Sequence, residues 1–220
     1  MPRPSLTDLD PRGQIRAATV TAVGHAFPMG VRTAGAVLTA LVTAAGLFAC
    51  TSADSSPAGP SPIGSTWRGL SVADEDRCSP YDSDNYSYPP SVEARIVFGL
   101  GGIFSPYTCE TFDSTRETDI EHVVARSEAH DSGLCGADTA TREQFARDLR
   151  NLTLASPGLN RDEKGAKDAA EWLPERNRCW FAQTVLNVRL SYGLTIDRRE
   201  AAVLERILSG CSSTGIRCDP

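Results

Sequence analysis

A histidine and two acidic residues stand close together in the run Asp119-Ile-Glu121-His122. An imidazole with an ordinary pKa of about 6.5 can take a proton from water near neutral pH. Carboxylate oxygens are the ligands that hard divalent cations prefer. The run therefore contains a candidate general base and part of a candidate metal site.

A second polar group follows a strand-like run further along the chain. Residues 152–154 are apolar or β-branched, residues 156–158 are Ser-Pro-Gly, and Asn160 opens a polar segment. This pattern is typical of a strand and a turn. The amide oxygen of Asn160 would add to the carboxylate donors if the two runs meet in space.

Strand geometry limits how the first run can work. Successive side chains of a strand point to opposite faces, so Asp119 and Glu121 would share one face and His122 would lie on the other. We therefore expect the chain to bend where this strand ends, because otherwise base and carboxylates cannot reach one phosphate.

Three motifs together resemble the HNH (ββα-metal, His-Me finger) endonuclease family. They are Asp119-Ile-Glu121-His122-Val-Val, then Asp148-Leu-Arg-Asn151-Leu, then Asn160-Arg161 with lysines close behind. The run Glu171-Trp-Leu-Pro174 is similar to the bacterial exported branch of that family, and the resemblance extends roughly from Cys78 to Cys211. It implies an α+β fold in which a small ββα-metal core is embedded in a mainly helical, disulfide-bonded single domain.

The resemblance also implies a role for each motif residue. The catalytic residues would be His122, as general base, and Asn151, which would tie down the long loop or orient His122. The metal ligands would be Glu121 and Asn160, with Asp119 as a further ligand or a support for one. The residues expected to contact phosphate are Arg161, Lys164 and Lys167, whereas His130 is not expected to be a ligand.

Two positions depart from the family pattern. Ala125 stands where a proline commonly follows the His-Val-Val run. Lys164 lies four residues after Asn160, where three is commoner, so either Lys164 or Lys167 could take the role of the family lysine.

The implied activity is metal-dependent hydrolysis of nucleic acid with low sequence specificity. DNA is the expected substrate and RNA the alternative, and the enzyme would act as a monomer. One divalent ion would bind, Mg²⁺ or Mn²⁺ from the oxygen ligands, with Zn²⁺ or Ni²⁺ as alternatives. Two other functions stay open: a non-catalytic surface lipoprotein that keeps the fold for binding a partner or polymer, and a hydrolase with a Cys–His or Ser–His pair.

Composition indicates one domain of ordinary size with an appendage. The chain has 220 residues, 40% of them hydrophobic, and a formal net charge of −6. Residues 1–49 carry four arginines and two aspartates, so the remainder has a net charge of −8. Such a charge argues against unspecific coating of nucleic acid, but it allows a nuclease whose basic groups gather at one cleft.

The first 66 residues have the pattern of an exported lipoprotein. Residues 1–28 read as a non-native extension before Met29, and residues 29–49 as a lipoprotein-type signal peptide. Cys50 would then be lipidated, residues 50–66 would form a Ser/Pro/Gly tether, and residues 67–220 the nuclease-like domain. The protein would sit on the outer face of the membrane through its lipid, or be secreted; a plain cleaved signal or an uncleaved anchor are the alternatives.

Six cysteines remain after Cys50. They are Cys78, Cys109, Cys135, Cys179, Cys211 and Cys218. An even number in an exported domain predicts a disulfide framework, and none of the spacings is that of a zinc knuckle or redox motif. The sequence does not choose among the possible pairings.

Apolar spacing and capping residues predict the remaining elements. The expected helices are 91–100, capped by Ser91, 141–149, 179–192 and 197–208, the last opened by a capping box at Asp197 and Glu200. Residues 103–112 are expected to be extended, and residues 168–173 to form a helical turn. The two last helices would serve as scaffold.

Overall fold

The structure, a computed structural model, describes residues 65–218. The expected extension 1–28, the signal peptide 29–49, Cys50 and all but the last two residues of the tether lie outside the described residues. Within residues 65–218, no helix has the length and apolarity needed to cross a membrane.

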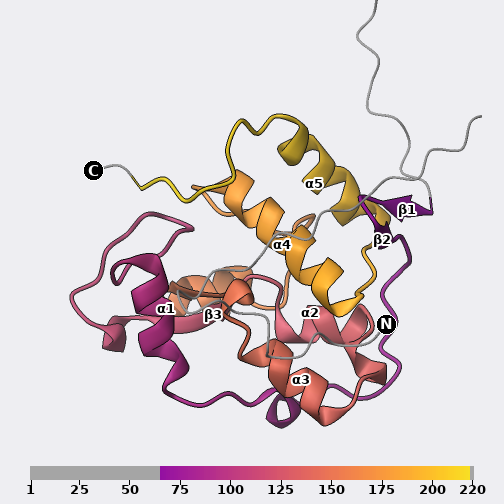
Figure 1. Cartoon of the computed structure of the whole chain (residues 1–220), viewed down its shortest axis with the longest axis horizontal. Coiled ribbons are helices and arrows are strands. Elements are labelled where there is room, and N and C mark those ends of the chain that lie inside the picture. Colours follow the sequence, from indigo (N-terminus) through magenta and orange to yellow (C-terminus); the bar gives the residue numbers. More distant parts are fainter. Residues whose placement is uncertain (1–64, 219–220) are drawn as a thin grey trace, which may run out of the picture. The chain divides into compact units, whose positions relative to one another are not determined.

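Helices and two small sheets make up the described part of the chain (Figure 1). The α-helices are α1 (Val92–Leu100), α2 (Arg126–Asp131), α3 (Thr139–Ala146), α4 (Arg178–Tyr192) and α5 (Arg198–Ser209). Short helical turns are η1 (Ser83–Tyr86), η2 (Thr115–Glu117), η3 (Leu134–Gly136), η4 (Leu149–Asn151) and the π-helical η5 (Leu159–Lys164). The strands are β1 (Thr66–Trp67), β2 (Leu70–Ser71), β3 (Asp119–His122) and β4 (Leu152–Ala155). This mixture fits the predicted α+β class.

The first sheet is a tight hairpin beside α5. Arg68 and Gly69 connect β1 to β2 with φ values of 45° and 92°, a left-handed pair that matches the twist of a two-residue hairpin. The indole nitrogen of Trp67 donates to Glu205 Oε2 at 2.8 Å. The hairpin is thereby attached to the C-terminal helix.

The second sheet pairs the two runs that the sequence singled out. β3 and β4 are antiparallel, with Ile120 opposite Leu154 and His122 opposite Leu152. Directly opposed residues share a face, so these four side chains lie on one side of the sheet. α1 covers that side, where Val92 and Ile96 pack with the two leucines. The sheet is therefore anchored by α1 on the face that carries His122.

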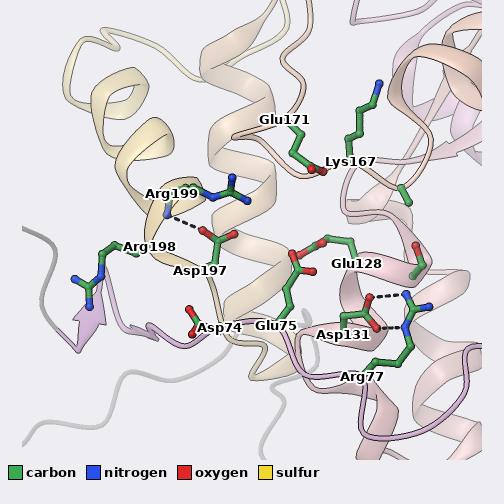
Figure 2. A pocket seen from close by; sticks show the side chains of 12 residues that line it. Asp74, Glu75, Arg77, Glu128, Asp131, Lys167, Glu171, Asp197, Arg198 and Arg199 are labelled. Atoms are coloured by element: carbon green, nitrogen blue, oxygen red, sulfur yellow. Dashed lines mark hydrogen bonds and ion pairs between the residues drawn. The ribbon is translucent and has the colours of Figure 1, made fainter.

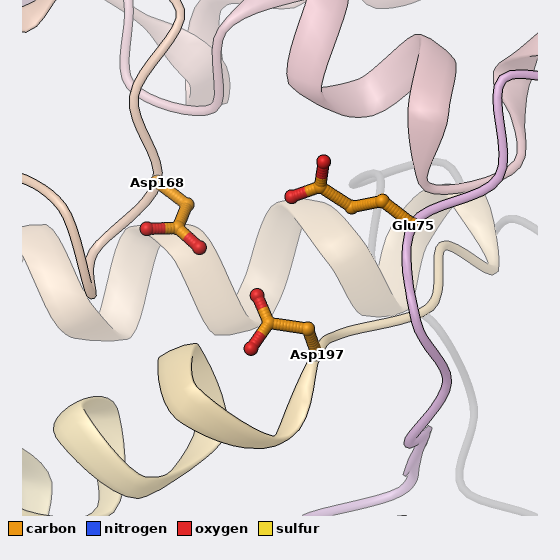
Figure 3. A group of neighbouring side chains, drawn as sticks. All are labelled: Glu75, Asp168 and Asp197. Atoms are coloured by element: carbon orange, nitrogen blue, oxygen red, sulfur yellow. The ribbon is translucent and has the colours of Figure 1, made fainter.

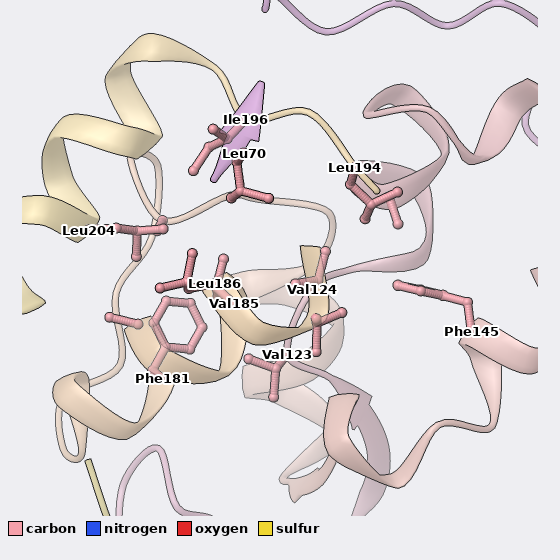
Figure 4. Packing of buried hydrophobic residues seen from close by; sticks show 14 of the residues in the cluster. Leu70, Val123, Val124, Phe145, Phe181, Val185, Leu186, Leu194, Ile196 and Leu204 are labelled. Carbon is pink, nitrogen blue, oxygen red and sulfur yellow. The ribbon is translucent and has the colours of Figure 1, made fainter. Parts of the chain in front are cut away.

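α4 and α5 form the scaffold around which the larger core gathers. Phe181, Val185 and Leu186 of α4 are buried with Leu204 of α5, and Val123 and Val124 pack into the same cluster (Figure 4). The chain just after His122 is consequently held by the core.

A buried arginine joins three helices. Arg189 of α4 pairs with Glu128 of α2 and with Glu200 of α5, each at 2.5 Å. The predicted capping box is half formed: Asp197 Oδ1 accepts from the backbone nitrogens of Arg199 and Glu200 at 2.6 and 3.0 Å. The Glu200 side chain turns to Arg189, because an uncompensated buried guanidinium would cost more than one lost capping bond.

The predicted helix over 141–149 is wrong at both ends. α3 begins at Thr139, because Asp138 accepts a hydrogen bond from the Thr141 nitrogen at 2.8 Å. It ends at Ala146, and Asp148 then caps η4 by accepting from the Arg150 nitrogen. Asp148 thus starts a new turn where the apolar pattern alone continued the helix.

Other predicted elements agree with the structure in outline, with one exception. α1 and α4 lie within one residue of their expected bounds and each is followed by a left-handed glycine, although Ser91 makes no side-chain capping bond. The expectation that residues 103–112 are extended is wrong, because they contain a single isolated bridge, between Phe104 and Thr111, and a turn at residues 106–108. Residues 168–171 form the expected turn.

The six cysteines form three disulfides, as the sequence predicted. The pairs are Cys78–Cys135, Cys109–Cys218 and Cys179–Cys211. Each bond joins segments that are 32 to 109 residues apart in sequence, so each restricts the unfolded chain substantially.

Replacing Ala125 with proline should stabilise the protein by about 0.4–1 kcal/mol. Ala125 has φ −58° and ψ 149°, which proline adopts without strain. The matched variant Ala129→Pro should destabilise by about 3 kcal/mol or more, because the Ala129 nitrogen donates to the Ala125 carbonyl at 2.9 Å. Urea denaturation measures both, and equal losses of stability in the two variants would contradict the backbone geometry described.

Candidate functional site

The two sequence runs meet at a cavity of about 210 Å³ beside the end of β3. From β3 it is lined by Ile120, Glu121 and His122, and from η5 by Asn160. The rest of its wall consists of Tyr81, Ala125, Arg126, Ser127, Gly165 and Ala166. Residues that carry an imidazole, a carboxylate and an amide, from segments about 40 residues apart, thus line one space.

His122 is buried and held by a single directed hydrogen bond. Its Nε2 lies 2.9 Å from the carbonyl oxygen of Ala146, the last residue of α3, and its ring packs against Tyr88 and Phe145. A carbonyl can only accept, so Nε2 carries the hydrogen and Nδ1 is the acceptor of the neutral ring. Burial, and then the charge of Arg126, lower the pKa of His122 to about 3. The ring is therefore neutral at physiological pH.

Asn151 is positioned to fix the bend that follows His122. Its side chain accepts from the Val124 nitrogen at 2.8 Å and donates to the Val124 oxygen at 3.0 Å. The backbone carbonyl of Asn151 accepts a hydrogen bond from the Val123 nitrogen at 2.8 Å. The chain bends at these two valines. Asn151 is fully buried and does not line the cavity, so it acts through the backbone next to His122.

Glu121 is paired with a lysine that is itself fully buried. Lys164 Nζ lies 2.7 Å from Glu121 Oε1 and donates to the His122 carbonyl at 3.0 Å. Tyr107 also donates to this carboxylate at 3.5 Å. Burial raises the pKa of Glu121, and the Lys164 ammonium opposes that rise. The expected phosphate contact by Lys164 is not what this position provides, because its ammonium is turned to Glu121 away from solvent.

Asp119 binds two residues of η5. It accepts a bidentate pair from Arg161 at 2.6 and 2.7 Å, and one bond from Asn160 Nδ2 at 3.1 Å. The Asn160 nitrogen is thereby fixed, which orients the amide oxygen to the other side. Asp119 consequently supports Asn160, while Arg161 stays largely exposed with its charge matched by Asp119.

Two residues of this cavity have side-chain oxygens that suit a hard divalent cation. Glu121 supplies a carboxylate and Asn160 an amide oxygen, both of the type that Mg²⁺ and Mn²⁺ bind. Asp119 fits less well, because Arg161 and Asn160 engage both of its oxygens. Of the two roles expected for Asp119, its contacts therefore favour the support of Asn160 over direct metal binding.

A larger cavity of about 580 Å³ (Figure 2) shares two lining residues, Ser127 and Ala166, with the smaller cavity. It is strongly charged, with Glu75, Glu128, Asp131, Glu171 and Asp197 facing Arg77, Lys167 and the arginines at the start of α5. Lys167 therefore belongs to this cavity, and its ammonium donates to the Glu163 carbonyl at 2.6 Å.

Three carboxylates converge next to this second cavity (Figure 3). Within residues 65–218, the group of three acidic, histidine or cysteine side chains with ligand atoms all within 4.8 Å of one another is Glu75, Asp168 and Asp197. Asp119, Glu121 and His122 do not form such a group. No sequence motif linked the three carboxylates, because they come from three separate segments.

The cysteine and serine alternatives find no support in the described residues. All six cysteines of residues 65–218 are in disulfides, so none of them is a free nucleophile. Ser79 Oγ lies 3.5 Å from His130 Nε2, but that nitrogen is 2.7 Å from the Ser79 carbonyl and must donate to it. His130 is fully buried, as expected for a structural residue.

Comparison with known proteins points to a nuclease. Residues 99–203 match the family "GmrSD restriction endonucleases, C-terminal domain". This segment of the chain is similar to an HNH-related nuclease domain. The match includes the cavity residues from β3 and η5, and so agrees with the predicted HNH resemblance at the level of a nuclease family.

A curated relative is described as an "Uncharacterized secreted protein" of Arthroderma benhamiae (strain ATCC MYA-4681 / CBS 112371). It is 32% identical over 123 residues, which are 54% of this chain and 60% of the relative. The chain thus matches less than two thirds of that protein. No solved structure matches the chain significantly.

Arg126 and Tyr81 are among the cavity residues to which the sequence analysis gave no role. Arg126 reads like any surface arginine, and Tyr81 lies in a turn-rich loop far from the motif. The one available signal was the position of Arg126, four residues after His122.

Lys164→Met should destabilise the protein by about 3–5 kcal/mol, because it leaves Glu121 as an unpaired buried carboxylate. Lys167→Met makes the same change at an exposed site and should shift stability by no more than about 0.5 kcal/mol. Chemical denaturation of both variants measures the difference. A loss below about 1 kcal/mol in Lys164→Met would show that the pair does not hold the site together.

The acidic group should make stability fall as pH rises. Burial and the neighbouring Glu128 raise the pKa of Glu75 to about 7, and burial with a hydrogen bond to Asp197 raises that of Asp168 to about 6. Unfolded carboxyls titrate near pH 4, at about 3.9 to 4.3. Between about pH 4 and pH 7 the folded state therefore holds more protons than the unfolded state, which lowers the free energy of unfolding with rising pH.

Glu75→Gln should remove much of this dependence. Its free energy of unfolding, relative to the unmodified protein, should grow from pH 4 to pH 8, whereas the exposed control Glu110→Gln should show a flat difference. Urea titrations across that range measure both. A flat difference for Glu75→Gln as well would mean that the three carboxylates do not share protons.

Proposed function

We propose that this protein is a metal-dependent endonuclease that hydrolyses phosphodiester bonds of nucleic acid, chiefly DNA, with low sequence specificity. The observation that carries the proposal is the common cavity of His122, Glu121 and Asn160. The similarity of residues 99–203 to a nuclease family supports the same reaction class. Folds host unrelated functions, so the site residues bear the argument.

His122 is the general base of the proposed reaction. Its Nε2 hydrogen is held by the Ala146 carbonyl, so Nδ1 takes the proton from the attacking water. A phosphodiester anion in the cavity raises the pKa of the imidazole, because a nearby negative charge favours the protonated ring. The Ala146 carbonyl also stabilises the imidazolium that forms, and Asn151 keeps the adjacent backbone in place.

Glu121 and Asn160 are the proposed protein ligands of one divalent ion, with Asp119 orienting Asn160. When bound, Mg²⁺ or Mn²⁺ supplies Lewis-acid stabilisation of the charge that builds on the phosphate oxygens. Lys164 opposes the rise that burial causes in the pKa of Glu121, and it holds the carboxylate in one orientation. This assigns the lysine to the metal ligand rather than to the substrate.

The site of action is outside the cytoplasm in this proposal. Three disulfides favour an oxidising compartment, and the fungal relative is described as secreted. A lipid anchor at Cys50 and a monomeric state belong to the same proposal. The alternative function, a non-catalytic surface lipoprotein that keeps the fold for binding, is favoured by one observation: Lys164 already occupies the Glu121 carboxylate.

Plasmid nicking by the purified protein with Mg²⁺ or Mn²⁺ tests the activity. EDTA should abolish it, and His122→Ala should lower it about 10³-fold, the usual contribution of a positioned general base. Asn160→Ala should also be strongly impaired, whereas Asn187→Ala on the exposed face of α4 should behave as the unmodified protein. Nicking that survives both EDTA and His122→Ala would discard the mechanism, and no nicking under any condition would favour the binding function.

A further inference from the structure

The basic side chains that the sequence analysis expected to contact phosphate are engaged by other groups of the protein. Lys164 is buried against Glu121, and Arg161 is paired in a bidentate manner with Asp119. Lys167 lines the second, acidic cavity. A basic side chain that contacts the phosphate beside the proposed metal ion therefore has to be a different one.

Arg126 meets that requirement. It lines the same cavity as His122 and Asn160, and it is half-buried at the start of α2. None of the ion pairs observed within residues 65–218 involves it. Its observed hydrogen bond is to the Tyr86 carbonyl at 3.5 Å, at the long end of the range. Its guanidinium thus keeps most of its donors for a ligand.

The charge of Arg126 is felt by the groups around the cavity. It lowers the pKa of His122 and opposes the burial that raises the pKa of Tyr81. Tyr81 lines the cavity as well, with its ring against His130. The guanidinium is therefore near enough to His122 and Tyr81 to act on both electrostatically.

We propose that Arg126 binds the scissile phosphodiester and orients it against His122. This inference rests on the nuclease function proposed above and adds the substrate-binding residue of that site. A guanidinium presents planar, paired donors that match two phosphate oxygens, and its charge balances the negative charge that grows during hydrolysis. Arg126 is the first residue of α2, which follows the bend that Asn151 fixes.

Arg126→Gln, Arg126→Lys and a control, Arg206→Gln, test the proposal. Arg206 lies on the exposed side of α5 and loses the same charge. The measurements are kcat and KM for plasmid and bis(p-nitrophenyl) phosphate, and binding of a fluorescent oligonucleotide in EDTA to proteins that also carry His122→Ala. Arg126→Gln should lower kcat/KM roughly 10²-fold on both substrates, and Arg126→Lys less, because lysine keeps the charge without the paired donors. Arg206→Gln should match the parent.

The outcomes separate this inference from the nuclease proposal. Cleavage by the parent with equal rates for Arg126→Gln and Arg206→Gln would overturn the role of Arg126 and leave the nuclease function standing. Oligonucleotide binding that requires Arg126 but no cleavage would leave the phosphate site and overturn the catalytic function. If the protein shows neither oligonucleotide binding nor cleavage, both proposals are overturned.

Discussion

A buried lysine joins the two halves of the site, and most of the local arrangement depends on it. Lys164 touches the Glu121 carboxylate and the His122 carbonyl at once, so the segment after β4 is fastened to the end of β3. Both charges are shielded from water, which makes their mutual dependence strong. The pairing keeps Asn160, four residues earlier, beside the carboxylate with which it lines the cavity.

The surroundings of this pair give each polar group one orientation. The Ala146 carbonyl selects the ring nitrogen of His122 that carries hydrogen, and Asp119 selects which end of the Asn160 amide faces away from it. The side chain of Asn151 forms two hydrogen bonds with the backbone of Val124, as a paired strand would, and so extends the pairing beyond the end of β3. A cavity built in this way is organised before any ligand arrives, and this reduces the reorganisation that catalysis requires.

Much of the secondary structure and of the site could be predicted from local sequence, whereas the remaining features depend on tertiary contacts. The motif residues could be named because they resemble those of a known nuclease family, and α1 and α4 because apolar periodicity and a following glycine define them. The partner of Lys164 could not be predicted, since a lysine in a polar segment normally faces water. The Glu75, Asp168 and Asp197 group was also missed, because no local rule relates three segments that meet only in the fold.

The most direct test of the account is where a divalent ion binds relative to the imidazole. Titration of Mn²⁺ into the ¹⁵N-histidine-labelled protein should broaden the ring signals of His122 ahead of those of His130, and Asn160→Ala should weaken that effect strongly. Broadening that is unaffected by Asn160→Ala but lost in Asp197→Asn would place the ion at the acidic group, and would contradict the claim that His122, Glu121 and Asn160 form the metal-dependent centre.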